Sequence, residues 1–234
     1  AAFSVMLLSG DITSGATGTI TYRRGDRFLA FGHPFMGLGP LPAPACAAYV
    51  HDVYPLNSGS YKITTPGPVL GAILQDRPFG VSGRVGKAPE TIPITVDVND
   101  ATTGRSKMYR MRAIPHPRLY AALVGLAVGS AVADIHSTPG PVTATVETVV
   151  EAQQLGTLRR SNVVYDGSLI DTAVTGDLDE ILTALSSNPF QPLGISSATV
   201  KVRLEAGRKT ATIEQVSVGS AKYRPGDTVD VMLT

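Results

Sequence analysis

The sequence is poor in the residues that mark several specialised classes of protein. It has no tryptophan, and its single cysteine, Cys46, excludes an internal disulfide, so cysteine content does not distinguish an oxidising from a reducing compartment. Charged residues make up only 17% of the chain, and the net charge is +1. Because there is no basic surplus and no basic run interleaved with aromatics, we expect no nucleic-acid partner.

Long apolar runs and metal-binding patterns are also lacking. The apolar stretch at residues 119–132 is shorter than the roughly 20 residues that a membrane-spanning helix needs, so we expect no membrane span. The chain begins on a strand-like sequence without a basic leader, and we expect no signal peptide in it. Neither C-x-x-C nor H-E-x-x-H occurs, and the four histidines are scattered. We therefore expect no metal and no cofactor.

The chain is instead rich in turn-forming and apolar residues. It holds 24 glycines and 17 prolines, and 43% of its residues are hydrophobic, which is typical of a turn-rich globular protein. A length of 234 residues suits one large β domain or two smaller ones. We expect two units, a β-barrel over residues 1–140 and a β-rich unit over residues 141–234 with a helix near 177–187.

Short β-branched and aromatic runs separated by turn residues predict a mainly β fold. The sequences RRGD and DATTGR predict hairpin turns, because glycine and aspartate tolerate the backbone angles of tight turns. Residues 32–46, GHPFMGLGPLPAPAC, are so rich in proline and glycine that they predict a loop without a long regular element. The predicted strands are residues 3–8, 18–22, 27–31, 49–56, 61–64, 69–75, 91–98, 108–114, 142–152, 198–204, 210–218 and 228–233.

Two segments predict helices. Residues 118–132 are apolar without strict alternation, which fits a buried helix or a buried strand, and their length favours the helix. Residues 176–187 form the second predicted helix, in which Asp177 would be the N-cap and Glu180 its partner in a capping box. Pro189 and Pro192 follow this segment and predict its end.

Four motifs occur in a defined order between Gly15 and Gly86: GTITY, FGHP, GAILQDR and GVSG. In this order they resemble the SpoIVB-type serine peptidases, and the resemblance covers about the first 135 residues. It implies a trypsin-like double β-barrel in a secreted or cell-envelope protein, with a protein or peptide as substrate or ligand. The sequence YRPGDTVDVML near the end is similar to the segment that follows this domain in bacterial envelope proteins of the same kind.

The resemblance also implies roles for individual residues. His33 of FGHP corresponds to the general base, and an imidazole is suited to that role because it exchanges a proton near neutral pH. Where the family has an orienting aspartate, the sequence RAIPHPRLY has His116, which cannot supply the charge of a carboxylate. The nucleophile turn GxSGSP becomes AVGSAVAD, in which Ser130 is the candidate nucleophile. Asp134 or Asp52 remains open as the missing carboxylate.

Other reactive side chains have simpler interpretations. Ser82 of GVSG belongs to a turn that has a structural role in the family's order. Cys46 and His51 are five residues apart on a predicted strand, so they would face opposite sides of it. Two functions remain open, a serine endopeptidase that uses His33 and Ser130, and a non-catalytic binding or assembly module on the same fold. Because β domains have edge strands that can pair between copies, a homo-oligomer also stays open.

Overall fold

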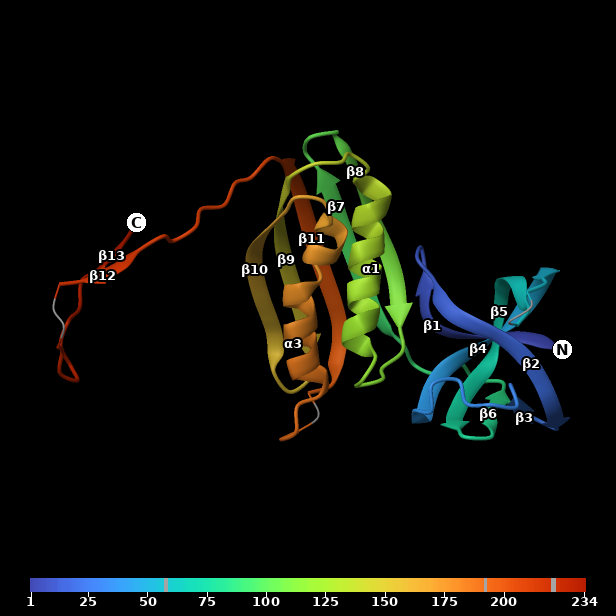
Figure 1. The fold of residues 1–234 in the computed structure, drawn as a ribbon. Coiled ribbons are helices and arrows are strands. Elements are labelled where there is room, and N and C mark those ends of the chain that lie inside the picture. The colour runs from blue at the N-terminus through green and yellow to red at the C-terminus, as the bar shows by residue number, and fades with distance from the viewer. Residues whose placement is uncertain (57–58, 192, 220–221) are drawn as a thin grey trace.

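A computed structural model describes residues 1–56, 59–191, 193–219 and 222–234 (Figure 1). The fold is mainly β, as the sequence predicts. The chain begins with six strands, β1 Ala2–Gly10, β2 Ser14–Arg24, β3 Arg27–Ala30, β4 Gly39–Tyr54, β5 Tyr61–Arg77 and β6 Gly80–Val85. There follow β7 Ile92–Asp100, β8 Arg105–Ala113, α1 Tyr120–Ile135, β9 Val142–Ala152, β10 Gly156–Asp166, α2 Ile170–Ala173, α3 Gly176–Ser186 and β11 Ile195–Ala206.

The first six strands close into an antiparallel barrel. Their order is β1-β2-β3-β6-β5-β4, and β4 returns to pair with β1. Apolar side chains such as Phe3, Val5 and Leu41 are buried in its interior. Strands β5 and β6 approach so closely that a Cβ atom on Gly83 would lie 2.3 Å from the Ala72 carbonyl oxygen. This explains why a glycine closes the GVSG motif.

The second half of the fold is a sheet with helices on one face (Figure 1). Its strand order is β10-β9-β11-β7-β8, in which β11 runs parallel to β7 and the other pairs are antiparallel. Alternate residues such as Val96, Tyr109 and Val200 are buried with the apolar face of α1, because successive side chains of a strand point to opposite faces. The double barrel implied by the resemblance is therefore not confirmed, since these strands form an open sheet.

Strand β1 joins the two halves. Residues Leu8–Gly10 pair with Met111–Ala113 of β8, while residues further towards the start of β1 pair with β2 and β4. The change from barrel to helix-covered sheet comes between β6 and β7. The boundary expected at residue 140 falls between α1 and β9. Strands on the two sides of this boundary pair with each other in one sheet, as Ala198 of β11 pairs with Ile94 of β7.

Beyond Gly207 the chain leaves this sheet. It runs as an extended segment to a separate two-stranded pair, β12 Val216–Val218 and β13 Val231–Leu233 (Figure 1). The side chains of both short strands are exposed. The strands predicted over residues 210–218 and 228–233 are therefore present in shortened form. Strand β10 was not predicted, because its sequence GTLRRSNVVYD has polar residues where a strand signal needs β-branched ones.

Both predicted helices are present, but the capping box predicted at the start of the second is not. Residues 118–132 are confirmed as a helix by α1, and residues 176–187 by α3. The predicted capping box is wrong, because Thr175 is the N-cap of α3 and makes no side-chain cap. Asp177 instead forms an ion pair with Arg160 of β10, so a tertiary partner has replaced the local hydrogen bond.

The loop predicted for residues 32–46 is only partly correct. Residues 31–38 are irregular, but the regular strand β4 starts at Gly39 and includes Pro40, Pro42 and Pro44. These prolines occupy every second position, so their ring nitrogens fall on one side of the strand. Among the described strands, this part of β4 pairs only with β5, and its pairing with β1 begins at Ala45. A missing N–H on the unpaired side removes no ladder bond, which is why the prolines are tolerated.

Candidate functional site

The loop that carries His33 is held by a buried carboxylate. This segment, residues 31–38, will be called the histidine loop. Asp76 of β5 is only 1% exposed and accepts hydrogen bonds from the backbone N–H groups of Phe35 (2.8 Å), Met36 (2.8 Å) and Leu38 (3.2 Å). Burial alone would raise the pKa of Asp76, but the backbone N–H donors outweigh it and lower the pKa. Asp76 is therefore ionised at neutral pH and fixes the loop.

Aromatic packing supports the same loop from the other side. Phe31 has a φ of 70°, which is unusual for a residue other than glycine, and its ring lies 5.5 Å from Phe3 and 5.8 Å from Phe35. The ring occupies the space beside Gly18 of β2, where a Cβ atom would lie 1.8 Å from Phe31 Cε1. The motifs GTITY and FGHP are therefore in direct contact, which gives a physical reason for their occurrence together.

The His33 ring is exposed on this loop. It stacks on Phe31 at 5.5 Å, and its Nδ1 atom lies 2.8 Å from the Pro34 carbonyl oxygen. Because a carbonyl only accepts hydrogen bonds, Nδ1 is the donor in this contact, and in the neutral ring the lone pair then lies on Nε2. Within the described part of the chain, His33 makes no other hydrogen bond and no ion pair.

Ser130 lies in the other half of the fold. It is on α1, beside a surface hollow that Gly129, Asp171 and Thr175 also line, where α1 faces α2 and α3. The histidine loop belongs to the barrel, between β3 and β4. Ser130 makes no hydrogen bond with His33 among the described residues. The structure therefore does not bring the candidate base and the candidate nucleophile together in a hydrogen bond.

His116 precedes α1 and is buried, with 8% of its surface exposed. Its Nδ1 atom has no hydrogen-bond partner within the described residues, and the same holds for the hydroxyl of Tyr120 one turn later. Both residues line a cavity of about 240 Å³ with Leu185 and Ile195. Burial, and secondarily the nearby Arg118, lowers the pKa of His116, so the ring is neutral at pH 7.

This burial predicts a pH dependence of stability. Above the ordinary value of 6.5 the ring is neutral in both states, but as the pH falls below 6.5 the unfolded chain takes up a proton that the folded chain resists. We expect the free energy of unfolding to fall between pH 7 and pH 5, and to fall less steeply in His116→Leu. Urea unfolding at several pH values measures both slopes. Equal slopes for the two proteins would contradict the assignment.

The candidate carboxylates are engaged elsewhere. Asp134 accepts hydrogen bonds from the Tyr109 hydroxyl (2.5 Å) and from Lys107 (3.2 Å). Asp52 accepts a hydrogen bond from the backbone N–H of Val53 at 2.7 Å. Neither is bonded to His33 in the described structure, so the ring is oriented by a backbone carbonyl and not by a carboxylate.

Sequence reasoning missed Asp76, although it lies within the quoted motif GAILQDR. The available signal was a carboxylate directly after an apolar strand, where burial requires hydrogen-bond partners. Ser82 lies on β6 opposite Leu29 and Gln75, as an ordinary strand residue. Cys46 is buried on β4 and His51 is exposed, bonded through Nε2 to the Thr65 hydroxyl at 2.7 Å.

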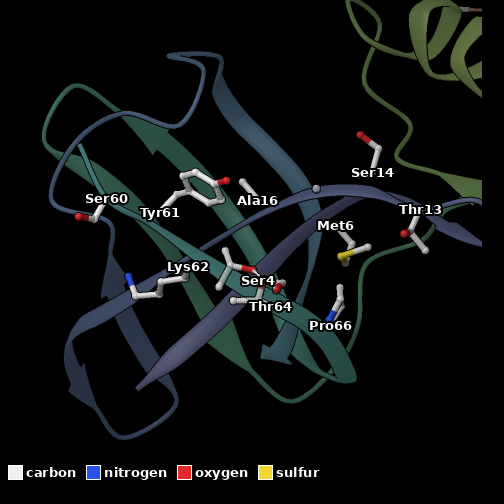
Figure 2. Close-up of a pocket in the computed structure, with 12 residues that line it drawn as sticks. Ser4, Met6, Thr13, Ser14, Ala16, Ser60, Tyr61, Lys62, Thr64 and Pro66 are labelled. Carbon is white, nitrogen blue, oxygen red and sulfur yellow. Dashed lines mark hydrogen bonds between the residues drawn. The ribbon is translucent and has the colours of Figure 1, made fainter. Parts of the chain in front are cut away.

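A hydroxyl-lined cavity of about 610 Å³ lies on the outside of the barrel (Figure 2). Ser4, Thr17 and Thr64 share two hydrogen bonds of 2.8 Å along its floor. Tyr61 and Lys62 of β5 lie at one side of it, and β2 residues from Ser14 to Thr17 also line it. Its volume is within the roughly 300–1,000 Å³ of ordinary ligand pockets.

No family model, curated protein or solved structure matches this chain. No helix in the described residues is long and apolar enough to cross a membrane. The described residues also contain no group of three or more His, Cys, Asp or Glu side chains placed to hold a metal ion.

Proposed function

We propose that this chain is a SpoIVB-peptidase-like domain of a secreted or cell-envelope protein that binds protein segments without cleaving them. The surroundings of His33 carry the proposal. Its ring is bonded to the Pro34 carbonyl, and none of the described hydroxyl or carboxylate groups is hydrogen-bonded to it. Members of a catalytic triad act as a unit, so the absence of one contact typically costs several orders of magnitude in rate.

The support given to the histidine loop fits a structural use of the peptidase-like barrel. Asp76 holds the loop through backbone N–H groups, and Phe31 packs against Gly18. Neither contact depends on the chemistry of the imidazole ring. A barrel that has lost its nucleophile can therefore keep this loop for folding reasons alone.

Exposed aromatic side chains support a binding role. Residues 48–54 of β4 and 61–66 of β5 form a two-stranded ribbon, which will be called the arm. On it Tyr49 is 68% exposed, Tyr54 50% and Tyr61 53%, and the last two rings stack at 5.3 Å. Aromatic residues grouped in this way are enriched at protein interfaces, because they bury a large area at low entropic cost.

One observation favours the alternative, an active serine endopeptidase. The Nδ1–H of His33 is bonded to a carbonyl, and in the neutral ring this places the lone pair on Nε2, which is the tautomer that a general base needs. In that case a nucleophile would have to reach Nε2 in the substrate complex. Ser130 is the candidate, and its position on α1 weighs against it.

Labelling by a fluorophosphonate separates the two functions. We expect no covalent labelling of the folded chain and no cleavage of a casein substrate, because none of the described serine hydroxyls is bonded to His33. Trypsin in the same reaction serves as the positive control. Labelling that disappears in both His33→Ala and Ser130→Ala would overturn the proposal in favour of the endopeptidase.

A further inference from the structure

We propose that the hydroxyl-lined cavity binds an extended peptide, which pairs with the open edge of β2 beneath the arm. The site, which will be called the slot, lies between residues 14–17 of β2 and residues 60–64 at the start of β5 (Figure 2). This inference deepens the proposed function by naming the class of ligand and the place where it binds. It involves neither His33 nor Ser130, so it can be tested independently of peptidase activity.

The first support is an unpaired strand edge. Strand β2 pairs with β1 from Ser14 to Thr19, but its pairing with β3 begins only at Ile20. Among the described strands, residues 14–18 of β2 therefore have a partner on one side only. An unpaired edge presents a row of backbone donors and acceptors that another chain can pair with.

The hydrogen bonds at the end of this edge show which backbone groups of β2 point away from β1. The Thr19 carbonyl accepts from the Phe31 N–H, on the side away from β1, whereas the Ile20 N–H donates to the Ala1 carbonyl. Backbone groups of successive strand residues alternate between the two sides. The N–H and C=O groups of Gly15 and Thr17 therefore point away from β1, as those of Thr19 do, along the open edge of the segment that lines the slot.

The opposite wall also has an open edge. Residues 61–66 of β5 pair with β4, and pairing of β5 with β6 begins only at Gly71. Across the gap the two walls are joined by side chains, since Thr64 is bonded to Thr17, which is bonded to Ser4. Each of these three hydroxyls has one O–H group, and the two hydrogen bonds use two of the three. The remaining O–H can donate to the carbonyl of a bound peptide.

The lining indicates the character of the peptide. Residues 14–17 span about 13 Å at the rise of an extended strand, so the edge can pair with about four peptide residues. The walls carry small hydroxyl side chains, and Lys62 is the one charged residue in the described lining. We therefore infer a segment of small and β-branched residues with a carboxylate that can approach Lys62, an exposed ion pair that raises the affinity about fivefold at most.

A carbohydrate is the competing ligand, because hydroxyls and an exposed tyrosine also suit a sugar. The peptide is favoured by the spacing of the backbone groups. Donors and acceptors that alternate along one strand edge match the repeat of another strand, and a sugar ring has no such repeat.

The test is peptide binding to the full chain and to two variants. A display library of random octapeptides is selected on the full chain, and an enriched peptide is synthesised with capped ends. Thr17→Val removes the hydroxyl and keeps the backbone N–H, whereas Thr17→Pro removes both. We expect Thr17→Val to weaken binding only about two- to threefold and Thr17→Pro to weaken it about tenfold more, because a hydrogen-bond donor to the peptide is lost.

A second series leaves the protein unchanged. N-methylation of the peptide at the residues that face β2 is expected to abolish binding, whereas methylation at the intervening residues serves as the matched control. Amide exchange of Gly15 and Thr17 should slow on binding, while that of Ala16, already paired with β1, should not change. Equal affinities of the proline and valine variants, or indifference to N-methylation, would overturn the inference. So would a selection that enriches no peptide while neutral oligosaccharides slow the Thr17 exchange.

Discussion

Asp76→Asn is expected to lower the free energy of unfolding by about 3 kcal/mol, because it removes a buried charge that accepts hydrogen bonds from three backbone N–H groups. An asparagine side chain has one oxygen where aspartate has two, and its NH₂ group would face the N–H donors of the histidine loop. Urea or guanidinium unfolding of the purified proteins measures the loss. Asp26→Asn is the matched control, since Asp26 forms an exposed ion pair with Arg84 at 3.8 Å and should change stability by less than about 1 kcal/mol.

The stability difference between wild type and Asp76→Asn should also depend on pH. The pKa of Asp76 is lowered in the folded protein, so its contribution is complete above the ordinary carboxyl value of 3.8 and is lost as the pH falls through the folded pKa. The difference between wild type and Asp76→Asn should therefore be constant near neutrality and shrink in acid below about pH 4. Equal losses from Asp76→Asn and Asp26→Asn at neutral pH would refute the role assigned to Asp76.

Gly18→Ala is expected to cost about 2–3 kcal/mol through overpacking, even though alanine adds a single methyl group. The new Cβ would lie 1.8 Å from Phe31 Cε1, and the Phe31 ring cannot move freely because Phe3 and Phe35 pack against it. Thermal and chemical unfolding measure the cost. Gly167→Ala is the control, since no atom lies within 4 Å of its Cβ position.

The double variant Gly18→Ala with Phe31→Gly tests the mechanism directly. Removing the ring opens the space for the new methyl group, and glycine at position 31 also suits the positive φ of 70°. We expect the double variant to lose less stability than the sum of the two single variants. Strict additivity would mean that the two positions are not in contact.

Much of the fold could be predicted because the signals are local. The RRGD hairpin depends on a tight turn, and helix α1 on the length and composition of one apolar run. Predictions that needed the partner of a segment were less successful. The prolines of β4 led to the prediction of a loop, because the sequence does not show that one side of this strand is unpaired. Asp177 was predicted as a helix cap, because the sequence does not show that it forms an ion pair with Arg160 on another element.

In the candidate site too, features with a local cause could be predicted and features that depend on distant segments could not. The position of His33 in an irregular loop follows from the glycine and proline around it. Its surroundings depend on contacts between distant segments, such as Asp76 of β5 with the backbone of residues 35–38. The slot could not be predicted, because it depends on the difference in length between two paired strands. Strand β2 has 11 residues and β3 only 4, so part of β2 has no partner in β3.

The position of β1 in both halves of the fold has a consequence for how the protein unfolds. Residues Leu8–Gly10 are paired with β8, and the ladder is extended by bonds from Ile114 N–H to the Leu7 carbonyl (3.0 Å) and from Asp11 N–H to the Arg110 carbonyl (3.1 Å). Because the first residues of the same strand close the barrel, loss of β1 would open the barrel and expose the edge of β8 together. We therefore expect unfolding of the barrel to remove the edge strand that covers β8, so that the stabilities of the two halves are coupled through β1.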